Sequence, residues 1–428
     1  MNDTVITEIS SAESTPRARR GPSDVRVAES GGRFHILRDG EIFEIKGAGL
    51  EFGSMQALAQ HGGNAFRNWR TDNGLISGDE LLDQAYEAGL MVAMCIDIGR
   101  ERRGFNYSDP QAVAYQLERA QAEVLKYKDH PALLAWIIGN EVDLLAKNPC
   151  YLDAINDISR MIHEVDGRHP TTTTFAEFSV ELADQVRERA PDLDFISIQK
   201  YGEIENLPRV LEQAQWDKPY WVTEWGAVGH WEVGKTSWGA PLEQTSSEKA
   251  ESYRRAWEVA LSSDPRLMGS FVFLWGQKQE RTPTWYGMFL ADGSKTEVID
   301  VLHHLWNGSW PELRSPQVGT LFLDGKTAGD SVKLAAGSTA MARIEATHPN
   351  GQALSYHWEI MHESTATQTG GDEEEVPEMV PDAVVAREPG YAAITAPERA
   401  GPYRLFVYVH DEQGHAAHAN FPFWVQRG

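Results

Sequence analysis

Two glutamates directly follow apolar, strand-like runs in this sequence. Glu141 comes after LLAWIIGN, and Glu224 comes after YWVT. An apolar run has no packing reason to end in a charge, although a single strand-end glutamate is more often part of a rim salt bridge than a catalyst. Two carboxylates that flank a glycosidic bond can cleave it, and in the retaining arrangement they lie roughly 5–5.5 Å apart. The pair therefore predicts carboxylate chemistry on a glycoside.

Motifs for other catalytic chemistries are missing from the sequence. The histidines are scattered, and the adjacent pair His303 and His304 would point in different directions on a helix. No cluster has the His/Cys spacing of a metal site. GAGLEFG (47–53) does not match G-x-G-x-x-G, and neither G-x-S-x-G nor a P-loop occurs. We therefore expect no metal and no cofactor.

Further polar and aromatic residues stand at expected strand ends or in the loops that follow them. In a parallel barrel, catalytic and binding groups gather at the carboxyl ends of the strands. For Glu51 and Asp97, contact with a sugar hydroxyl and a salt bridge are about equally favoured, and Trp225 fits packing as well as stacking on a sugar. The candidates for substrate binding are Arg67, Asn140, Tyr201, Trp275, Glu51, Asp97, Trp225, Gln277, Gln279 and Trp285.

The elements that must position these residues alternate regularly along the chain. Apolar strand-like runs are separated by helical patterns, and runs of this kind are typical of parallel strands buried on both faces. Eight such units close a barrel of about 250 residues, so the sequence predicts an α/β fold with a (β/α)8 TIM barrel. The eight runs are 45–52, 64–70, 90–98, 132–141, 171–177, 194–201, 220–227 and 269–277.

Several of the intervening helices have recognisable ends. Asp109-Pro110 and Asn148-Pro149 each combine an N-cap residue with proline at the first helical position. Ser246 or Ser247 is the predicted start of a later helix, and 297–306 the last one. Asp166-Gly167 is a predicted helix stop.

The residue composition and the hydrophobic pattern change on both sides of the predicted barrel. Residues 1–24 are polar, small or charged and predict a disordered arm, and a hairpin with an Asp39-Gly40 turn follows. We assign 25–312 to the barrel with this hairpin. From 313 to 428, short alternating strands punctuated by Gly, Pro and Asn predict an antiparallel, immunoglobulin-like β-sandwich. Its segment 364–382 is an acidic loop, for which a solvated surface is favoured over a calcium site.

Charge and composition limit the partners. The formal net charge of −24 argues against nucleic acid, because phosphate binding needs a basic face. No run is long and apolar enough for a membrane span, and the N-terminal segment lacks the apolar centre of a signal peptide. The sequence as written therefore predicts a cytoplasmic protein, and a trimmed precursor would be periplasmic or secreted. The oligomeric state is left open.

Four motifs in this sequence resemble those of a known family. W-x-x-G-N-E (136–141) and T-E-W-G (223–226) resemble the strand-4 and strand-7 motifs of clan A glycoside hydrolases. GGNAFRNWR (62–70) and GSFVFLWG (269–276) are similar to the second-strand and eighth-strand segments of the barrel domain of glycoside hydrolase family 2. The likeness covers roughly residues 43–306, and the four motifs occur in the family's order.

The resemblance implies a role for each matching residue. It makes Glu141 the acid/base, Glu224 the nucleophile and Arg67 the electrostatic partner of Glu224. It implies that Asn140 binds the sugar 2-hydroxyl and that Tyr201 hydrogen-bonds the nucleophile. Typical family 2 enzymes carry two β-domains before the barrel, whereas this sequence shows a sandwich after it. The resemblance therefore says more about clan and chemistry than about substrate.

We predict a retaining β-glycoside hydrolase, with possible transglycosylase activity, that acts on a β-linked glucan or oligosaccharide. A first alternative is an exo-enzyme of other specificity, for galactoside, mannoside or glucuronide. A second is a catalytically inactive barrel that binds carbohydrate, which the presence of both glutamates disfavours. A third places carbohydrate binding on the sandwich, but Tyr356, Trp358 and Trp424 fit inward strand positions better than an exposed platform.

Overall fold

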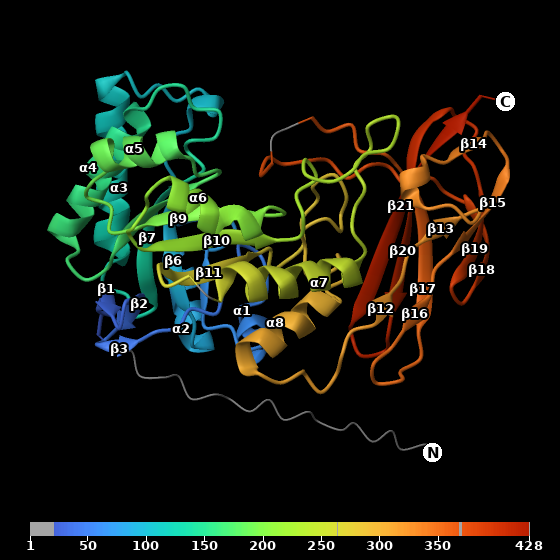
Figure 1. Ribbon diagram of the computed structural model, residues 1–428, viewed down its shortest axis with the longest axis horizontal. Helices are drawn as coiled ribbons and strands as arrows, with labels where there is room; N and C mark the ends of the chain where they lie inside the picture. The colour runs from blue at the N-terminus through green and yellow to red at the C-terminus, as the bar shows by residue number, and fades with distance from the viewer. Residues whose placement is uncertain (1–20, 263, 368–369, 428) are drawn as a thin grey trace, which may run out of the picture.

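The computed structural model describes residues 21–262, 264–367 and 370–427. Its first part is a closed barrel of parallel strands in the order β10-β11-β4-β5-β6-β7-β8-β9, which confirms the predicted TIM barrel (Figure 1). Each of the eight strands lies within or overlaps one of the predicted runs. They are β4 (Gly47–Gly49), β5 (Ala65–Arg67), β6 (Met91–Ile96), β7 (Leu133–Asn140), β8 (Thr171–Phe175), β9 (Ile196–Gln199), β10 (Tyr220–Gly226) and β11 (Leu267–Phe273).

Helices follow the strands and cover the outside of the barrel (Figure 1). Amphipathic helices such as α4 bury one face against the strands, which is where most of their stability comes from. The helices are α1 (Met55–Gln60), α2 (Gly78–Ala88), α3 (Pro110–Tyr127), α4 (Cys150–Val165), α5 (Val180–Arg189), α6 (Leu207–Gln213), α7 (Ser246–Ala256) and α8 (Glu297–Asn307).

Local capping explains where several of these helices begin. Asp109 caps α3 by accepting hydrogen bonds from the backbone of Gln111 and Ala112, as predicted. The sequence predicts Ser246 or Ser247 as the cap of α7, but α7 begins at Ser246 and Thr245 caps it in a reciprocal box with Glu248. A cap of this kind stabilises a helix by about 1 kcal/mol.

A small antiparallel sheet packs on the barrel near the amino ends of its strands. It consists of β1 (Val25–Ser30), β2 (Arg33–Arg38) and β3 (Glu41–Ile42), with the predicted turn at Asp39-Gly40. Val25 and Ile36 join barrel residues such as Phe271 in one hydrophobic cluster. Most of the predicted disordered arm, residues 1–20, lies outside the described residues. Within its last residues, Ser23 is buried and its hydroxyl donates to the Leu133 carbonyl oxygen at 2.8 Å.

The second part of the chain is a sandwich of two four-stranded sheets. Their orders are β13-β15-β19-β18 and β14-β21-β20-β17, and all pairs are antiparallel except β14 with β21. Trp358 is buried between the sheets, as expected for an inward residue. The strands are β12 (Gln317–Val318), β13 (Phe322–Leu323), β14 (Lys333–Ala335), β15 (Thr339–Arg343), β16 (Ala346–Thr347), β17 (Ser355–His362), β18 (Val384–Glu388), β19 (Tyr391–Thr395), β20 (Gly401–His410) and β21 (Ala416–Gln426).

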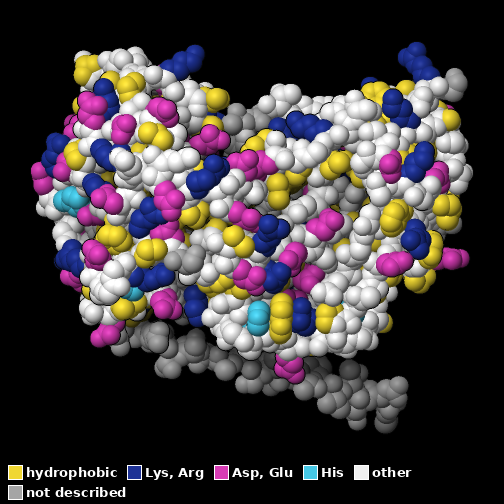
Figure 2. Space-filling model, viewed as in Figure 1, with side chains coloured by type: hydrophobic (Ala, Val, Ile, Leu, Met, Phe, Trp, Pro, Cys, Tyr) yellow, Lys and Arg dark blue, Asp and Glu magenta, His cyan; other side chains and the backbone are white. Residues whose placement is uncertain are grey.

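The sandwich packs against the side of the barrel that carries α7 (Figure 1). The backbone of β21 is tied to the start of α7, because His418 N–H donates to the Ser246 hydroxyl at 3.0 Å. Trp424 lies against Trp238 of the loop after β10, with ring centroids 5.9 Å apart. On the face drawn in Figure 2, acidic and basic side chains are interspersed, so the net charge of −24 does not form a patch of one sign there.

Candidate active site

The residues expected to do the chemistry meet at the carboxyl ends of the barrel strands. Arg67 ends β5, Asn140 ends β7 with Glu141 next to it, and Glu224 lies near the end of β10. Tyr201 follows β9 by two residues. Because parallel strands end on the same side of a barrel, these side chains share one face.

Glu224 receives hydrogen bonds from four donors. Arg67 Nη1 lies 2.7 Å from Glu224 Oε1, and the Trp69 indole N–H donates to the same oxygen at 3.1 Å. Gln199 Nε2 also donates to Oε1 at 3.0 Å, and the Tyr201 hydroxyl donates to Oε2 at 2.6 Å. An ionised carboxylate accepts all of these bonds, and a charge-assisted bond from arginine is among the strongest. Oε2 has the fewest donors and keeps lone-pair density for another atom.

The orientation of Asn140 is fixed by its neighbours. Its Oδ1 accepts from Arg67 Nη2 at 2.7 Å, from Gln199 Nε2 at 2.8 Å and from the Thr174 hydroxyl at 3.1 Å. Arginine and the glutamine NH2 group can only donate, so the oxygen of Asn140 must face them. The NH2 group of Asn140 points away from them and makes no hydrogen bond with the described residues, which leaves a donor for a ligand.

The carboxyl group of Glu141 has different surroundings from that of Glu224. Its φ of +48° is unusual for a residue with a side chain, and its backbone N–H donates to the Thr174 carbonyl oxygen at 3.1 Å. The half-buried carboxyl makes no hydrogen bond with the described residues. Burial, followed by the charges of Glu224 and Asp143, raises its pKa well above the usual value. Burial and the neighbouring carboxylates thus favour the protonated form of Glu141.

The aromatic residues at the site differ in part from those expected. Burial and the charge of Glu224 raise the pKa of Tyr201, so its hydroxyl keeps its proton and donates to Glu224. The ring of Phe273, at the end of β11, lies 5.8 Å from that of Trp69 and 5.9 Å from that of Tyr201. Trp275, which the sequence favoured, is fully buried, and its indole N–H donates to the Ser54 carbonyl oxygen at 3.0 Å. Phe273 therefore lies beside Tyr201, whereas Trp275 is a packing residue.

Two other predicted tryptophans are packing residues in this structure. Trp225 is fully buried, and its ring lies 5.5 Å from Tyr253 and 6.3 Å from Trp257, on the side of the strand that faces the helices. Trp285 is buried, and its indole N–H donates to the Val228 carbonyl oxygen at 2.9 Å. Neither ring is exposed for stacking on a sugar.

The predicted polar candidates at the rim lie in ion pairs or loops. Arg70 Nε is 2.7 Å from Glu51 Oε1, and burial raises the pKa of Glu51 despite the charges of Arg70 and Arg67. Asp97 pairs with Arg100 at 3.0 Å, so the salt-bridge alternative describes both carboxylates.

The two predicted glutamines lie in the loop after β11. Gln277 is exposed and donates to the Pro283 carbonyl oxygen at 2.9 Å. The amide oxygen and nitrogen of Gln279 are shielded from solvent without a hydrogen-bond partner among the described residues.

Sequence reasoning missed Gln199 and Phe273. Gln199 is buried and links Asn140 to Glu224, although in the sequence it is only a polar residue near the end of DFISIQKY. Its signal was its position, at the end of a buried strand on the same face as Tyr201. Nothing in the sequence singled out Phe273, because an apolar residue in an apolar strand is expected to be part of the hydrophobic core.

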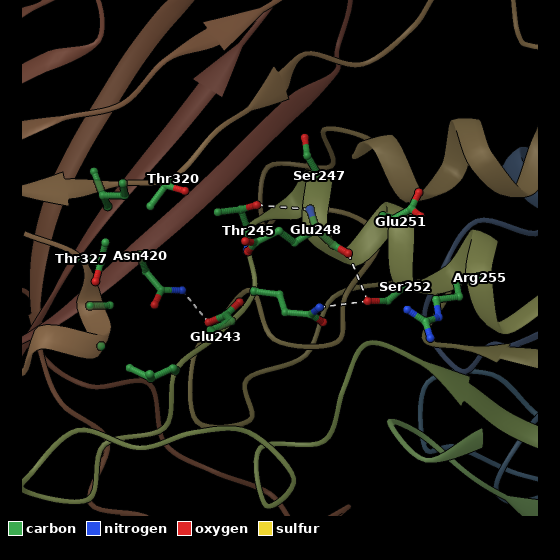
Figure 3. Close-up of a pocket in the computed structure, with 15 residues that line it drawn as sticks. Glu243, Thr245, Ser247, Glu248, Glu251, Ser252, Arg255, Thr320, Thr327 and Asn420 are labelled. Atoms are coloured by element: carbon green, nitrogen blue, oxygen red, sulfur yellow. Dashed lines mark hydrogen bonds between the residues drawn. The ribbon is translucent and has the colours of Figure 1, made fainter. Parts of the chain in front are cut away.

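A separate pocket lies between the barrel and the sandwich. It has a volume of about 720 Å³ and is lined by α7, the segment before it and parts of the sandwich such as Thr320, Thr327 and Asn420 (Figure 3). Glu243 and Asn420 bond to each other at its wall. Neither Glu141 nor Glu224 lines it, so it is distinct from the site at the strand ends.

The described part of the chain offers neither a cluster for a metal ion nor a helix that could span a membrane. No group of three or more His, Cys, Asp or Glu side chains there could hold a metal ion. No helix in that part has the length and apolarity to cross a membrane. Cys95 is buried, and burial raises the pKa of its thiol to about 12, so it is a packing residue.

The structure is a closed parallel barrel with one glutamate after its fourth strand and one on its seventh, the arrangement that the resemblance to clan A glycoside hydrolases implies. Residues 81–257, which run from α2 past α7 and contain both glutamates, match the family model described as glycosyl hydrolases family 2, TIM barrel domain. Over this range the barrel is similar to the TIM barrel domain of family 2 glycosyl hydrolases. No curated protein matches the sequence.

Solved structures share this fold at low identity. β-Glucuronidase 2 from Bacteroides uniformis, covalently bound to cyclophellitol-6-carboxylate aziridine, has 14% identity and a TM-score of 0.50 over 96% of this chain and 48% of its own. The β-D-glucuronidase of Dictyoglomus thermophilum has 20% identity and a TM-score of 0.51 over 68% of this chain and 54% of its own. The Bifidobacterium dentium β-glucuronidase complexed with coumarin-3-O-glucuronide has 17% identity and a TM-score of 0.52 over 67% of this chain and 49% of its own. The chain spans about half the length of these proteins, and the likeness shows the fold alone.

Proposed function

We propose that this chain is a retaining β-glycoside hydrolase with Glu224 as nucleophile and Glu141 as acid/base. The observation that carries the proposal is the contrast between the two glutamates. Glu224 is held by four donors as a carboxylate, whereas Glu141 has a raised pKa and a free carboxyl group. Paired carboxyl groups with these two protonation states are what double displacement at a glycoside requires.

In the first step, Glu141 gives its proton to the glycosidic oxygen as the bond from that oxygen to the anomeric carbon breaks. Glu224 Oε2 forms the new bond to the anomeric carbon, which yields a glycosyl ester. The leaving group departs as a neutral alcohol. The unpartnered NH2 group of Asn140 is placed to donate to a sugar hydroxyl during this step, and such bonds strengthen in the transition state.

In the second step, water attacks the anomeric carbon and the ester bond to Glu224 breaks. The charge of Glu224 is one of the causes that raise the pKa of Glu141, and esterification removes that charge. The pKa of Glu141 then falls, so the carboxylate left after the first step can take a proton from the attacking water. The same residue thus serves as acid and then as base.

The charges around the site favour a neutral sugar, as in a β-linked glucan or oligosaccharide. Arg67 is paired with Glu224 at 2.7 Å, and Arg70 is paired with Glu51 at 2.7 Å. Lys278 is paired with Glu280 at 2.5 Å. Recognition of a uronic acid carboxylate would need a cation that these pairs do not supply. The glucuronidases that share the fold make a glucuronide the second candidate.

The experiment that tests this proposal is a substrate screen with purified protein. Aryl β-glucoside, β-galactoside, β-mannoside and β-glucuronide are offered in parallel with β-1,2-, β-1,3-, β-1,4- and β-1,6-glucans, with Glu224→Gln as the control. We expect release of aglycone from a neutral β-glycoside by the wild type and none above background by the variant. Exclusive hydrolysis of the glucuronide would overturn the neutral-sugar assignment, and no turnover of any β-glycoside would overturn the function.

A further inference from the structure

A short segment of the sandwich reaches the catalytic side of the barrel. It belongs to the acidic loop between β17 and β18, drawn in orange in Figure 1, and we call residues 370–374 the strap. On one side of the barrel mouth, Asp372 lies 3.1 Å from Arg102 Nη1 and 2.5 Å from Arg103 Nη2. Both arginines belong to the one-turn helix η1 (Glu101–Arg103), in the loop after β6.

The strap is also held at the other side of the mouth. Glu374 is buried and accepts from the backbone N–H of Arg281 at 2.7 Å, in the loop after β11. A Cβ at Gly370 would lie 3.5 Å from the ring of Trp231, which belongs to the loop after β10. The same Cβ would lie 3.3 Å from the carboxylate of Glu280.

The order of strands shows that these anchors lie on opposite sides. Between β6 and β10 the barrel order is β5, β4 and β11 in one direction and β7, β8 and β9 in the other. Three strands separate them either way, so their loops face each other across the mouth. Gly370 and Asp372 are two residues apart, a span of at most roughly 7 Å. Within that span, the strap joins the two sides.

Intermediate residues link the strap to both glutamates of the site. Burial is the largest cause of the raised pKa of Glu141, and Arg102, which Asp372 binds, is one of two arginines whose charges act in the opposite direction. The ring of Trp231 lies 5.7 Å from that of Tyr201, whose hydroxyl donates to Glu224. The segment therefore crosses the mouth close to the place where the proposed function requires a sugar to bind.

We infer that the strap closes one end of the active site, so that the enzyme removes units from chain ends and does not cut inside a polymer. Asp372 and Glu374 are the specificity-determining residues, because their ion pairs hold the strap across the mouth. A cleft that binds an internal part of a polysaccharide must be open at both ends. This inference rests on the proposed function and adds to it the mode of attack.

The test compares a strap variant with a matched control. Asp372→Asn with Glu374→Gln removes the charges that anchor the strap. Glu373→Gln with Glu375→Gln makes the same change in net charge at exposed positions with no ion pair among the described residues. Each protein is assayed on the aryl β-glycoside found in the screen, on oligosaccharides of the same sugar and on its soluble polymer, and the first products are separated by size.

We expect the wild type and the control to release only the terminal sugar from every oligosaccharide at early times. In the strap variant, the ratio of kcat/KM on polymer to kcat/KM on aryl glycoside should rise by about tenfold, the size expected for loss of a few ion pairs. Early products longer than one sugar from the wild type would overturn the inference. So would an unchanged ratio in the strap variant.

A second measurement does not depend on turnover. Amide hydrogen exchange is followed in peptides that cover the strap and in peptides that cover η1. The strap variant should exchange at least several-fold faster than the control in both regions, because local opening is governed by the contacts that hold a segment. Equal exchange in the two variants would show that the strap is not anchored to the barrel, even if no β-glycoside were cleaved. Slow strap exchange without any turnover would instead overturn the proposed function alone.

Discussion

Two groups of charged and polar side chains in this molecule differ in the role that their surroundings fit, one for chemistry and one for stability. The catalytic group contains Glu141 and Glu224 at the strand ends. The other group, which we call the interdomain cluster, contains Glu243, Lys249, Thr282, Thr284 and Asn420 where the barrel meets the sandwich. Burial is the largest single cause that acts on the pKa of both Glu141 and Glu243, yet the two pKa values move in opposite directions.

In the interdomain cluster every buried charge is compensated. Lys249 Nζ lies 2.6 Å from Glu243 Oε1, and Thr284, Thr282 and Asn420 also donate to the carboxylate of Glu243. Burial alone would raise the pKa of Glu243, but the charges of Lys249 and His418, together with the hydrogen bonds from Lys249 and Thr282, outweigh burial and lower the pKa to about 2. Glu141 has no such partner, and it has the like charge of Glu224 nearby. A compensated cluster stabilises the joint between domains, whereas an uncompensated acid is available for proton transfer.

The largest effect that would follow from this difference is at Glu224. Replacement by Gln keeps the shape but removes the nucleophile, so we expect kcat to fall on the order of 10⁴-fold or more. Aglycone release from the best aryl β-glycoside measures it. Urea unfolding of the same variant is the control, and a variant that folds normally but keeps more than about a tenth of the activity would contradict the assignment.

Loss of the uncompensated acid should be nearly as severe but should depend on the leaving group. Glu141→Gln is expected to lower kcat/KM by about 10²–10⁴-fold on an oligosaccharide, because general acid catalysis contributes that much. On an aryl glycoside with an acidic phenol, the first step needs little protonation, so the loss of kcat/KM should be much smaller. Equal losses on both substrates would mean that Glu141 does not protonate the leaving oxygen.

Breaking the compensated cluster should affect stability and not chemistry. Lys249→Met leaves Glu243 buried without its counter-charge, which is expected to cost about 3–5 kcal/mol of the free energy of unfolding. Urea unfolding measures it, and the double variant with Glu243→Leu should recover much of the loss. If Lys249→Met reduced kcat in the folded protein as strongly as Glu141→Gln does, the separation of roles between the two clusters would be wrong.

The cluster at the interface also predicts a pH dependence. Because the pKa of Glu243 is about 2 in the folded protein and about 4.3 in an unfolded chain, its stabilising contribution is present above pH 4.3. That contribution is lost as pH falls towards 2. The free energy of unfolding of Glu243→Gln should therefore decline less between pH 5 and pH 3 than that of the wild type. Parallel pH curves for the two proteins would contradict the compensated state of Glu243.

The smallest expected effect is on the pKa of Glu141. Asp143 is one of the charges that raise its pKa, and the pKa of Asp143 is itself raised to about 7 by burial. Asp143→Asn should lower the pKa of Glu141, so the decline of kcat/KM at high pH should begin at lower pH, by less than about one unit. An unchanged pH profile would show that the charge of Asp143 does not reach Glu141.

The catalytic group was predictable from the sequence because its members stand in short motifs at strand ends. Asn140 and Glu141 are adjacent, and Arg67, Tyr201 and Glu224 each lie within a run that was recognised as a strand. The family resemblance gave these residues their roles, and hydrogen-bond geometry fits them.

The residues that were missed depend on how strands are placed beside each other. Gln199 links Asn140 and Glu224, but only the register of β9 against β10, which shifts between Val222 and Glu224, brings it there. Phe273 was also missed, because its ring contact with Tyr201 joins segments that are far apart in the sequence. The strap was read as a solvated acidic loop, because its ion pair with Arg102 joins residues 270 positions apart.

The most direct test of the account is the anomeric configuration of the first product. Hydrolysis of the best β-glycoside is followed by proton NMR from the first minutes, before the free sugar equilibrates. The account predicts that the β-anomer appears first and that the α-anomer grows only later, because Glu224 inverts the anomeric carbon once and water inverts it again. Appearance of the α-anomer first would mean a single displacement by water, and Glu224 would not be the nucleophile.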